Sequence, residues 1–109
     1  IGGAKRLVGS VLSIKPVLHI ENGQIGRLAS VRTKSKAIAH MLDVVLGEMK
    51  GKQHIHAGII HAGAPQDAEA IKQQVLQAVR PEELLLNELT PVIGANVGPG
   101  VVGMGYYTE

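Results

Sequence analysis

The last fifth of the chain reads Thr90-Pro91-Val92-Ile93-Gly94-Ala95-Asn96-Val97-Gly98-Pro99-Gly100-Val101-Val102-Gly103-Met104-Gly105-Tyr106-Tyr107. Five of the chain's fourteen glycines fall between Gly94 and Gly105, and Pro99 stands between two of them. A backbone this rich in glycine adopts conformations, or approaches its neighbours so closely, that side chains are excluded. We therefore expect a tight turn that leads into a final strand over residues 101–107.

This glycine-rich turn has two interpretations. Successive N–H groups in a turn can form a concave anion-binding site. Pro99 supplies no such donor, however, and no Gly-Lys-Ser/Thr ending follows the glycines, so the pattern does not predict a nucleotide-binding P-loop. The turn either contacts another kind of ligand or simply guides the chain into its last strand.

The composition restricts the class of protein. A chain of 109 residues suits a single domain with its own core. Cysteine is absent, which excludes disulfides and thiolate zinc sites and is typical of the reducing cytoplasm. No apolar run reaches the roughly 20 residues of a membrane span, so we expect a soluble, cytoplasmic protein. Phe and Trp are also absent, so the core has to be aliphatic.

The first third of the chain predicts a helix and a hairpin. Apolar residues at helical spacing favour a short amphipathic helix over residues 4–12. Strands over 17–20 and 25–31 flank Asn22-Gly23, the strongest short hairpin signal in the chain. In the second strand, Gly26 indicates a bulge or a close approach.

The rest of the chain predicts helices that alternate with strands. Thr33 or Ser35 caps a long helix that ends at Gly51. The remaining predicted elements are strands over 54–60, 84–86 and 101–107, and a helix that Pro65 begins and Pro81 stops. This order combines antiparallel and crossover connections. The sequence therefore predicts an α/β fold, a two-layer sandwich with a mixed β-sheet and helices packed on one face.

Five histidines raise the question of a metal site, because His54, His56 and His61 lie close together in the sequence. In a strand, His54 and His56 share one face and His61 points to the other, so the three converge only with a bulge. No cysteine or neighbouring carboxylate in the sequence completes a ligand set. We therefore expect no metal and no cofactor.

The sequence also predicts no catalysis. Its serines lack the Gly-x-Ser-x-Gly elbow of serine hydrolases, and no His–carboxylate pair stands out that would activate them. One dense positive cluster does appear, at Arg27, Arg32, Lys34 and Lys36. It is either a solvated face or a patch that steers a partner or a phosphate, for which Arg32 offers a planar bidentate fork.

Three blocks of the sequence resemble the DegV family of fatty-acid-binding proteins. Residues 94–100, Gly-Ala-Asn-Val-Gly-Pro-Gly, are similar to that family's Gly-x-His-Thr-Gly-Pro-Gly signature. Gly2-Gly3-Ala4 with residues 8–18 is similar to its Gly-Gly-Ala...Gly-Ser-Leu-Leu-x-Ile-Lys-Pro-Ile-Leu block. Residues 21–33 resemble its hairpin and the basic residue that closes it. The blocks keep the family's order and spacing, and together they span almost the whole chain.

The resemblance implies a bacterial fatty-acid carrier without catalytic activity. Such a carrier buries the acyl chain of a long-chain fatty acid and presents the carboxylate to a separate fatty-acid kinase. DegV proteins have two lobes, and residues 1–109 match only the C-terminal one. The N-terminal lobe, which supplies hydroxyl side chains to the carboxylate, is expected to lie outside this chain.

The resemblance also implies the binding residues. It places Asn96 beside the carboxylate and makes Gly94, Gly98 and Gly100 the other ligand-binding residues, and it places Arg32 on the surface that meets the kinase. Where the family usually has His-Thr, this chain has Asn96-Val97. Asparagine can still donate a hydrogen bond through its amide, but it cannot become charged.

Two other functions stay open. One is a nucleic-acid-binding or transcriptional regulatory module, a label that the family has also carried. The net charge of +2 and the scarcity of aromatic side chains, only Tyr106 and Tyr107, count against it. The other is a structural fragment that is inert without its second lobe.

Overall fold

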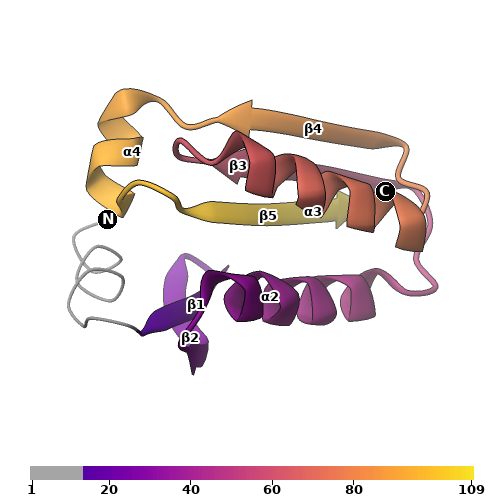
Figure 1. Cartoon of the computed structure of the whole chain (residues 1–109). Helices are drawn as coiled ribbons and strands as arrows, with labels where there is room; N and C mark the ends of the chain where they lie inside the picture. Colours follow the sequence, from indigo (N-terminus) through magenta and orange to yellow (C-terminus); the bar gives the residue numbers. More distant parts are fainter. Residues whose placement is uncertain (1–13) are drawn as a thin grey trace.

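The computed structural model describes residues 14–109, and the helix expected over residues 4–12 lies outside them. The described elements, labelled in Figure 1, are β1 (Lys15–Glu21), β2 (Gln24–Val31), α2 (Lys34–Met49), β3 (Ile55–His61), α3 (Pro65–Ala78), β4 (Glu83–Glu88), α4 (Pro91–Val97) and β5 (Val102–Thr108). Within residues 14–109, no helix has the length and apolar character needed to cross a membrane.

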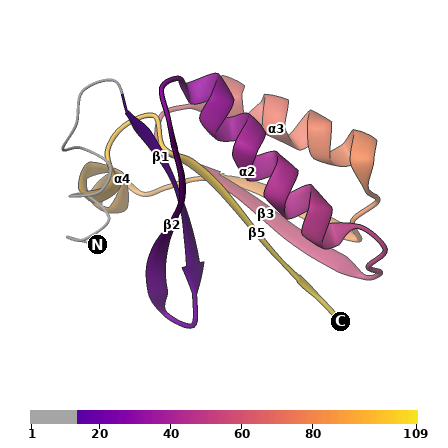
Figure 2. The same cartoon turned by 90° about the horizontal axis from the view of Figure 1, so that it is seen from below.

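A three-stranded sheet is the centre of the described structure. β3 lies in the middle, parallel to β4 on one side and antiparallel to β5 on the other. α3 joins the parallel pair, because parallel neighbours need a crossover connection. Figure 2 shows α2 and α3 side by side over one face of this sheet. The predicted mixed sheet with helices on one face is confirmed.

The hairpin forms a separate two-stranded sheet that packs against α2. Its turn residues Asn22 and Gly23 both have positive φ, 53° and 76°, as a type I′ hairpin turn requires. The pairing register shifts just after Val17, which places an irregularity in the ladder. Gly26 allows a close approach, because a Cβ there would lie 2.6 Å from Nε2 of His19.

The core lies between the central sheet and the two long helices. Alternate side chains of β3 are buried toward the helices, and α3 faces them with a buried stripe at helical spacing. The buried core residues are all aliphatic or methionine, as the absence of Phe and Trp predicted: Leu42, Met49, Ile55, Ala57, Ile59, Ala68, Ile71 and Val75. Val79, four residues after Val75, follows the end of α3 and is only partly buried.

The starts of the two long helices follow their sequence signals. Oγ1 of Thr33 accepts a hydrogen bond from the N–H of Lys36 at 3.2 Å, so Thr33 rather than Ser35 caps α2. Pro65 occupies the first turn of α3, as expected. The first turns of both helices lie at the same end of the molecule, where β3 ends (Figure 1).

The glycine-rich run differs from the expected turn. Pro91–Val97 form a short helix, α4, and the tight turn is confined to Gly98–Gly100. Thr90 caps this helix by accepting a hydrogen bond from the N–H of Ile93 at 3.4 Å, and Pro91 occupies its first turn. A capping Thr followed by Pro is a helix-start signal, and the abundance of glycine obscured it in the sequence.

Candidate functional site

The glycine turn, Gly98–Gly100, sits at the carboxyl end of β3. Gly98 and Gly100 have φ of 96° and 85°, values that residues with a side chain rarely adopt. The N–H of Gly100 donates to the carbonyl of Ala62 at 2.7 Å, and the N–H of Ala62 donates to the carbonyl of Val101 at 2.9 Å. These two hydrogen bonds fasten the turn to the residue that follows β3.

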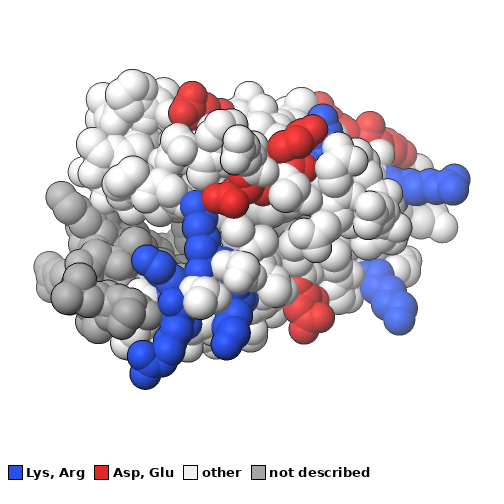
Figure 3. Space-filling view, viewed as in Figure 1, with Lys and Arg blue, Asp and Glu red and all other residues white. Residues whose placement is uncertain are grey.

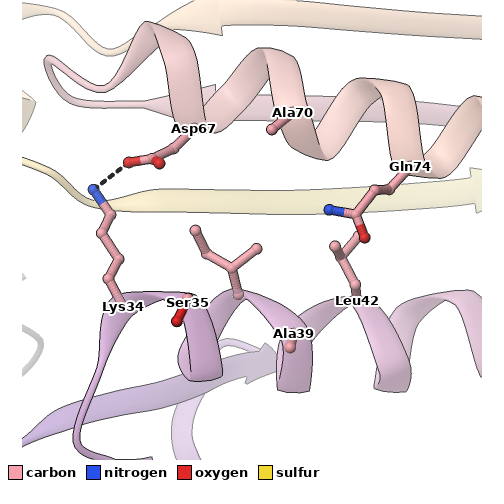
Figure 4. Close-up of a pocket in the computed structure, with 8 residues that line it drawn as sticks. Lys34, Ser35, Ala39, Leu42, Asp67, Ala70 and Gln74 are labelled. Atoms are coloured by element: carbon pink, nitrogen blue, oxygen red, sulfur yellow. Dashed lines mark ion pairs between the residues drawn. The ribbon is translucent and has the colours of Figure 1, made fainter.

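An ion pair lies beside the glycine turn. Nζ of Lys34, at the start of α2, is 2.6 Å from Oδ2 of Asp67, in the first turn of α3. Figure 4 shows the two side chains meeting between the helices, at one end of a groove that Ser35, Ile38, Ala39, Leu42, Ala70 and Gln74 also line. A Cβ at Gly100 would lie 3.4 Å from Nζ of Lys34, so glycine at this position leaves room for the lysine.

His61 fixes the loop between β3 and α3. Its side chain is buried, and its Nδ1 accepts a hydrogen bond from the N–H of Ala64 at 3.0 Å. Nδ1 is therefore the unprotonated ring nitrogen. The bond orders a second hollow at the start of α3, lined by Lys34, Gly63, Ala64, Pro65, Gln66 and Asp67.

Two of the four predicted ligand-binding residues pack on Ala62, and the other two do not. A Cβ at Gly94 would lie 3.7 Å from Cβ of Ala62, so Gly94 and Gly100 both pack on Ala62. Asn96 is exposed on α4, and its side-chain N–H donates to the carbonyl of Val92 at 2.9 Å. Among residues 14–109, a Cβ at Gly98 would have no heavy atom within 4 Å apart from its chain neighbours. The role of all four in ligand binding stays a prediction.

The basic residues expected to form one patch have different surroundings. Lys34 pairs with Asp67, and the guanidinium of Arg27 donates to a serine of its own strand at 3.2 Å. Arg32 and Lys36 are exposed. Figure 3 shows Lys and Arg side chains gathered where the hairpin meets the start of α2. Arg32 is thus accessible, and its contact with a partner stays a prediction.

The second face of the central sheet, opposite the helices, carries glycines and exposed apolar side chains. Gly58 lies between Leu85 and Gly105, and Ile60 pairs with Gly103 in the neighbouring row. We call these five residues the open face. Leu85 is 52% exposed and Ile60 41%. Within the described part of the chain, a Cβ at Gly58 or Gly105 would meet no heavy atom within 4 Å, and neither residue has positive φ. Neither the surrounding atoms of this part nor the backbone conformation therefore requires glycine at these positions.

A group of ionisable side chains lies at the other end of the central sheet, where β3 and β4 begin and β5 ends. We call it the His/Glu cluster: His54, His56, Glu82, Glu83 and Glu109. Nδ1 of His54 contacts Glu82, Nε2 of His56 contacts Glu109, and Nδ1 of His56 lies 3.1 Å from Glu83. The hydrogen bond to Glu83, and then the contact with Glu109, raise the pKa of His56 above its ordinary value, although burial opposes them.

The sequence argument that no carboxylate accompanies the histidines is therefore wrong. His56 and His61 do lie on opposite faces of β3, as their spacing predicted. The carboxylates could have been found from the order of the strands in the sheet. The start of a strand parallel to β3 and the end of a strand antiparallel to it lie at the same end of the sheet as the start of β3. Glu82, Glu83 and Glu109 therefore fall beside His56.

Comparison with known proteins identifies the family. The family model described as "Uncharacterised protein, DegV family" matches residues 1–109. A DegV domain-containing protein of Halalkalibacterium halodurans is 33% identical over 109 residues, which are 100% of this chain and 38% of the relative. One of Streptomyces coelicolor is 38% identical over 105 residues, or 95% of this chain and 37% of the relative. The chain thus spans less than two fifths of these relatives.

Two solved structures share the fold. A DegV family protein from Thermus thermophilus, described for its fatty acid binding, is 34% identical with a TM-score of 0.82, and the match covers 100% of this chain and 39% of that one. A fatty acid binding DegV family protein from Streptococcus agalactiae is 29% identical with a TM-score of 0.79, and the match covers 100% and 38%. Because the family model matches the chain from end to end, this protein belongs to the DegV family.

Proposed function

We propose that this chain is the C-terminal lobe of a carrier that binds a long-chain fatty acid and presents its carboxylate to a separate fatty-acid kinase. One observation carries the proposal. The whole chain aligns, at 34% identity and a TM-score of 0.82, with the Thermus thermophilus protein described as binding fatty acid. A second lobe belongs to the proposal because the chain spans only 39% of that protein.

The apolar character of the open face supports the binding of an apolar ligand or of the second lobe at this surface. The described neighbours of Gly58 and Gly105 would leave room for a side chain at either position. Because both residues lack one, the middle of the sheet between Ile60 and Leu85 is exposed. Apolar surface that is left exposed at one place commonly marks a binding site. An acyl chain, or the second lobe that encloses it, would bury this surface and regain the hydrophobic free energy of about 25 cal/mol per Å².

The glycine turn supports a neutral contact with the carboxylate. Lys34, the nearest cation described, is paired with Asp67 at 2.6 Å, so its charge is already balanced. In the described structure, no heavy atom beyond the chain neighbours lies within 4 Å of a Cβ position at Gly98, which leaves room for a ligand to approach the backbone there. The N–H groups of Gly98 and Gly100 already donate to Gly94 and Ala62, and Pro99 has none. We therefore assign the carboxylate to the side-chain amide of Asn96, a neutral donor, and to hydroxyl groups of the other lobe.

We further propose that the protein carries its ligand without transforming it. Both solved relatives compared above are described as binding fatty acid. Near the glycine turn, Nδ1 of His61 is engaged by the N–H of Ala64, so this imidazole holds the loop in place. Phosphoryl transfer would then be the task of the kinase, and Arg32, exposed beside the hairpin, would contact that enzyme.

Mass spectrometry of lipid extracted from the purified full-length protein tests the proposal. We expect one fatty acid per protein molecule, enriched in one class of chain length. A protein that carries no lipid, and does not retain fatty acid when it is supplied, would overturn the proposed function.

A variant of the open face tests where the acyl chain or second lobe lies. Gly105→Val adds a β-branched side chain that strands favour, at a position where a Cβ would meet no heavy atom of residues 14–109 within 4 Å. We expect the fold of this lobe to persist while fatty-acid retention falls at least tenfold. Val44→Ala, on α2 away from the open face, is the matched control and should retain fatty acid normally. Normal retention by Gly105→Val would remove the open face from the proposal.

A further inference from the structure

The His/Glu cluster is held by the backbone of three strands. The N–H of Glu82 donates to the carbonyl of Ile55 at 2.8 Å, and the N–H of Glu109 donates to the carbonyl of His54 at 3.3 Å. His56 stands opposite Glu83 in the parallel ladder. His56 and Glu83 lie within β3 and β4, and His54, Glu82 and Glu109 directly flank the three strands. Strand register therefore brings the five side chains to one end of the sheet.

The ring of His56 is fixed in orientation. Its Nδ1 lies 3.1 Å from Oε1 of Glu83, and its ring stacks on Tyr107 with centroids 4.8 Å apart and an interplanar angle of 6°. Only 15% of the side chain is exposed. A proton on Nδ1 that is donated to Glu83 leaves Nε2 as the nitrogen with a free lone pair. The ring is thus set in one direction, with Nε2 available to a proton or a metal ion.

Nε2 of His56 faces two carboxylates. It is buried and makes no hydrogen bond of acceptable geometry within the described residues, although it contacts Oε1 of Glu109 and lies 3.7 Å from Oε2 of Glu82. A lone pair that faces two negatively charged oxygens in a partly dehydrated site is repulsive. A cation between these three atoms removes the repulsion, and that cation is either a proton on Nε2 or a metal ion.

The donor set suits a metal ion. One ligand atom from each of His56, Glu82 and Glu109 lies within 4.8 Å of the other two. Ligands of a tetrahedral Zn²⁺, bound at about 2.0–2.1 Å, lie roughly 3.4 Å apart. Small rotations of Glu82 and Glu109, whose side chains are 49% and 62% exposed, would close the difference. Nδ1 of His54, which contacts the other oxygen of Glu82, orients that carboxylate.

We propose that the His/Glu cluster binds one divalent transition-metal ion, with His56, Glu82 and Glu109 as ligands and water in the remaining positions. Imidazole and carboxylate together favour Zn²⁺ and similar first-row ions over Mg²⁺ or Ca²⁺, which prefer oxygen alone. Glu83 then acts as the outer carboxylate that orients a metal-bound histidine through its second ring nitrogen. Such an ion would tie the starts of β3 and β4 to the end of β5.

Calorimetric titration of metal-free full-length protein with Zn²⁺ tests the site. We expect one equivalent to bind and the melting temperature to rise with Zn²⁺ concentration, since a ligand that binds the folded state stabilises it by mass action. His56→Gln and Glu109→Gln should each weaken binding at least tenfold. Glu109→Gln changes an exposed side chain at the end of β5, so it provides a test even if His56→Gln folds poorly.

Two matched controls separate this site from adventitious binding. His40→Gln, on α2, and Glu88→Gln, at the opposite end of β4, remove the same kinds of ligand elsewhere, and both should bind Zn²⁺ as the unmodified protein does. The proposal is overturned if the unmodified protein binds no Zn²⁺, or if the two cluster variants bind it as tightly as the controls. Either result would leave the proton as the cation on Nε2.

Discussion

At the scale of single residues, Asn96 and Gly98 would serve the proposed ligand binding in different ways. One N–H of the Asn96 side-chain amide donates to its own helix in this structure, and the amide has a second N–H that a ligand can accept from. Gly98 combines φ of 96° with ψ of 148°, a region that is essentially restricted to glycine. The first residue therefore has a replaceable hydrogen bond, and the second has a backbone conformation that other residues cannot take without strain.

We predict that Asn96→Ala lowers fatty-acid affinity of the full-length protein tenfold or less, because one neutral hydrogen bond contributes on the order of 1 kcal/mol. Gly98→Val should cost more, since strain of about 1–3 kcal/mol distorts the turn as well. Affinity is measured by displacement of a fluorescent fatty acid, with the melting temperature of each variant recorded. If Asn96→Ala binds normally and Gly98→Val loses only stability, the glycine turn is scaffolding and the carboxylate is held elsewhere.

At the scale of elements, local signals predicted most of the structure. Asn22-Gly23 gave the hairpin turn, Thr33 the start of α2, and Pro65 the start of α3, because each signal acts within a few residues. α4 was missed for a physical reason. It has only seven residues, Gly94 among them, and a helix so short has little stability of its own. Its capping by Thr90 and its packing on Ala62 stabilise it, and the second of these depends on tertiary structure.

The two hydroxyls at the start of α2 give an element-scale prediction. Thr33→Ala should lower the free energy of unfolding by about 1 kcal/mol, because the N–H of Lys36 loses its acceptor. Ser35→Ala is the matched control and should change it much less, since Ser35 is exposed inside the helix and only contacts the Thr33 hydroxyl at 3.3 Å. Denaturant unfolding of the full-length protein measures both. An equal loss from the two variants would show that Thr33 is not the main cap.

At the scale of the whole molecule, the sequence did not predict which distant residues meet. The His/Glu cluster joins β3, β4 and β5, and Glu83 lies 27 residues after His56. Strand order alone brings them together, and periodicity does not specify it. The same holds for Lys34 and Asp67, which meet only because α2 and α3 lie side by side. This ion pair also reduces the positive charge available to a partner.

That reduced charge leads to a prediction about nucleic acid. The aromatic side chains are engaged as well, since Tyr106 donates to Glu48 at 3.2 Å and Tyr107 stacks on His56, so stacking on bases is disfavoured. We expect gel shifts of the full-length protein to show only weak binding that disappears with salt. Sequence-selective, submicromolar binding with a salt slope of several phosphate contacts would favour the regulatory interpretation instead.

The last prediction concerns the surface where the hairpin meets α2. Arg32 is exposed there, in the connection between β2 and α2. Because it is not part of the glycine turn, we expect coupling to the proposed kinase and retention of lipid to be separable. Arg32→Ala should slow acyl-phosphate formation by the kinase severalfold and leave fatty-acid retention unchanged. Lys36→Ala removes an equally exposed charge from the same surface. It is the control for a general loss of positive charge.

The difference in kinase rate between Arg32→Ala and Lys36→Ala distinguishes specific recognition of Arg32 from a general effect of positive charge. A guanidinium forms two parallel hydrogen bonds with a carboxylate or phosphate, whereas an ammonium acts as a point charge. If Arg32 recognises one group on the kinase, Arg32→Ala should reduce the rate much more than Lys36→Ala, and Arg32→Lys should restore only part of it. Equal losses from Arg32→Ala and Lys36→Ala would reduce the patch to long-range steering, which added salt would screen within about 10 Å. Loss of fatty-acid retention in Arg32→Ala would instead place this residue at the ligand and contradict the proposed division of roles.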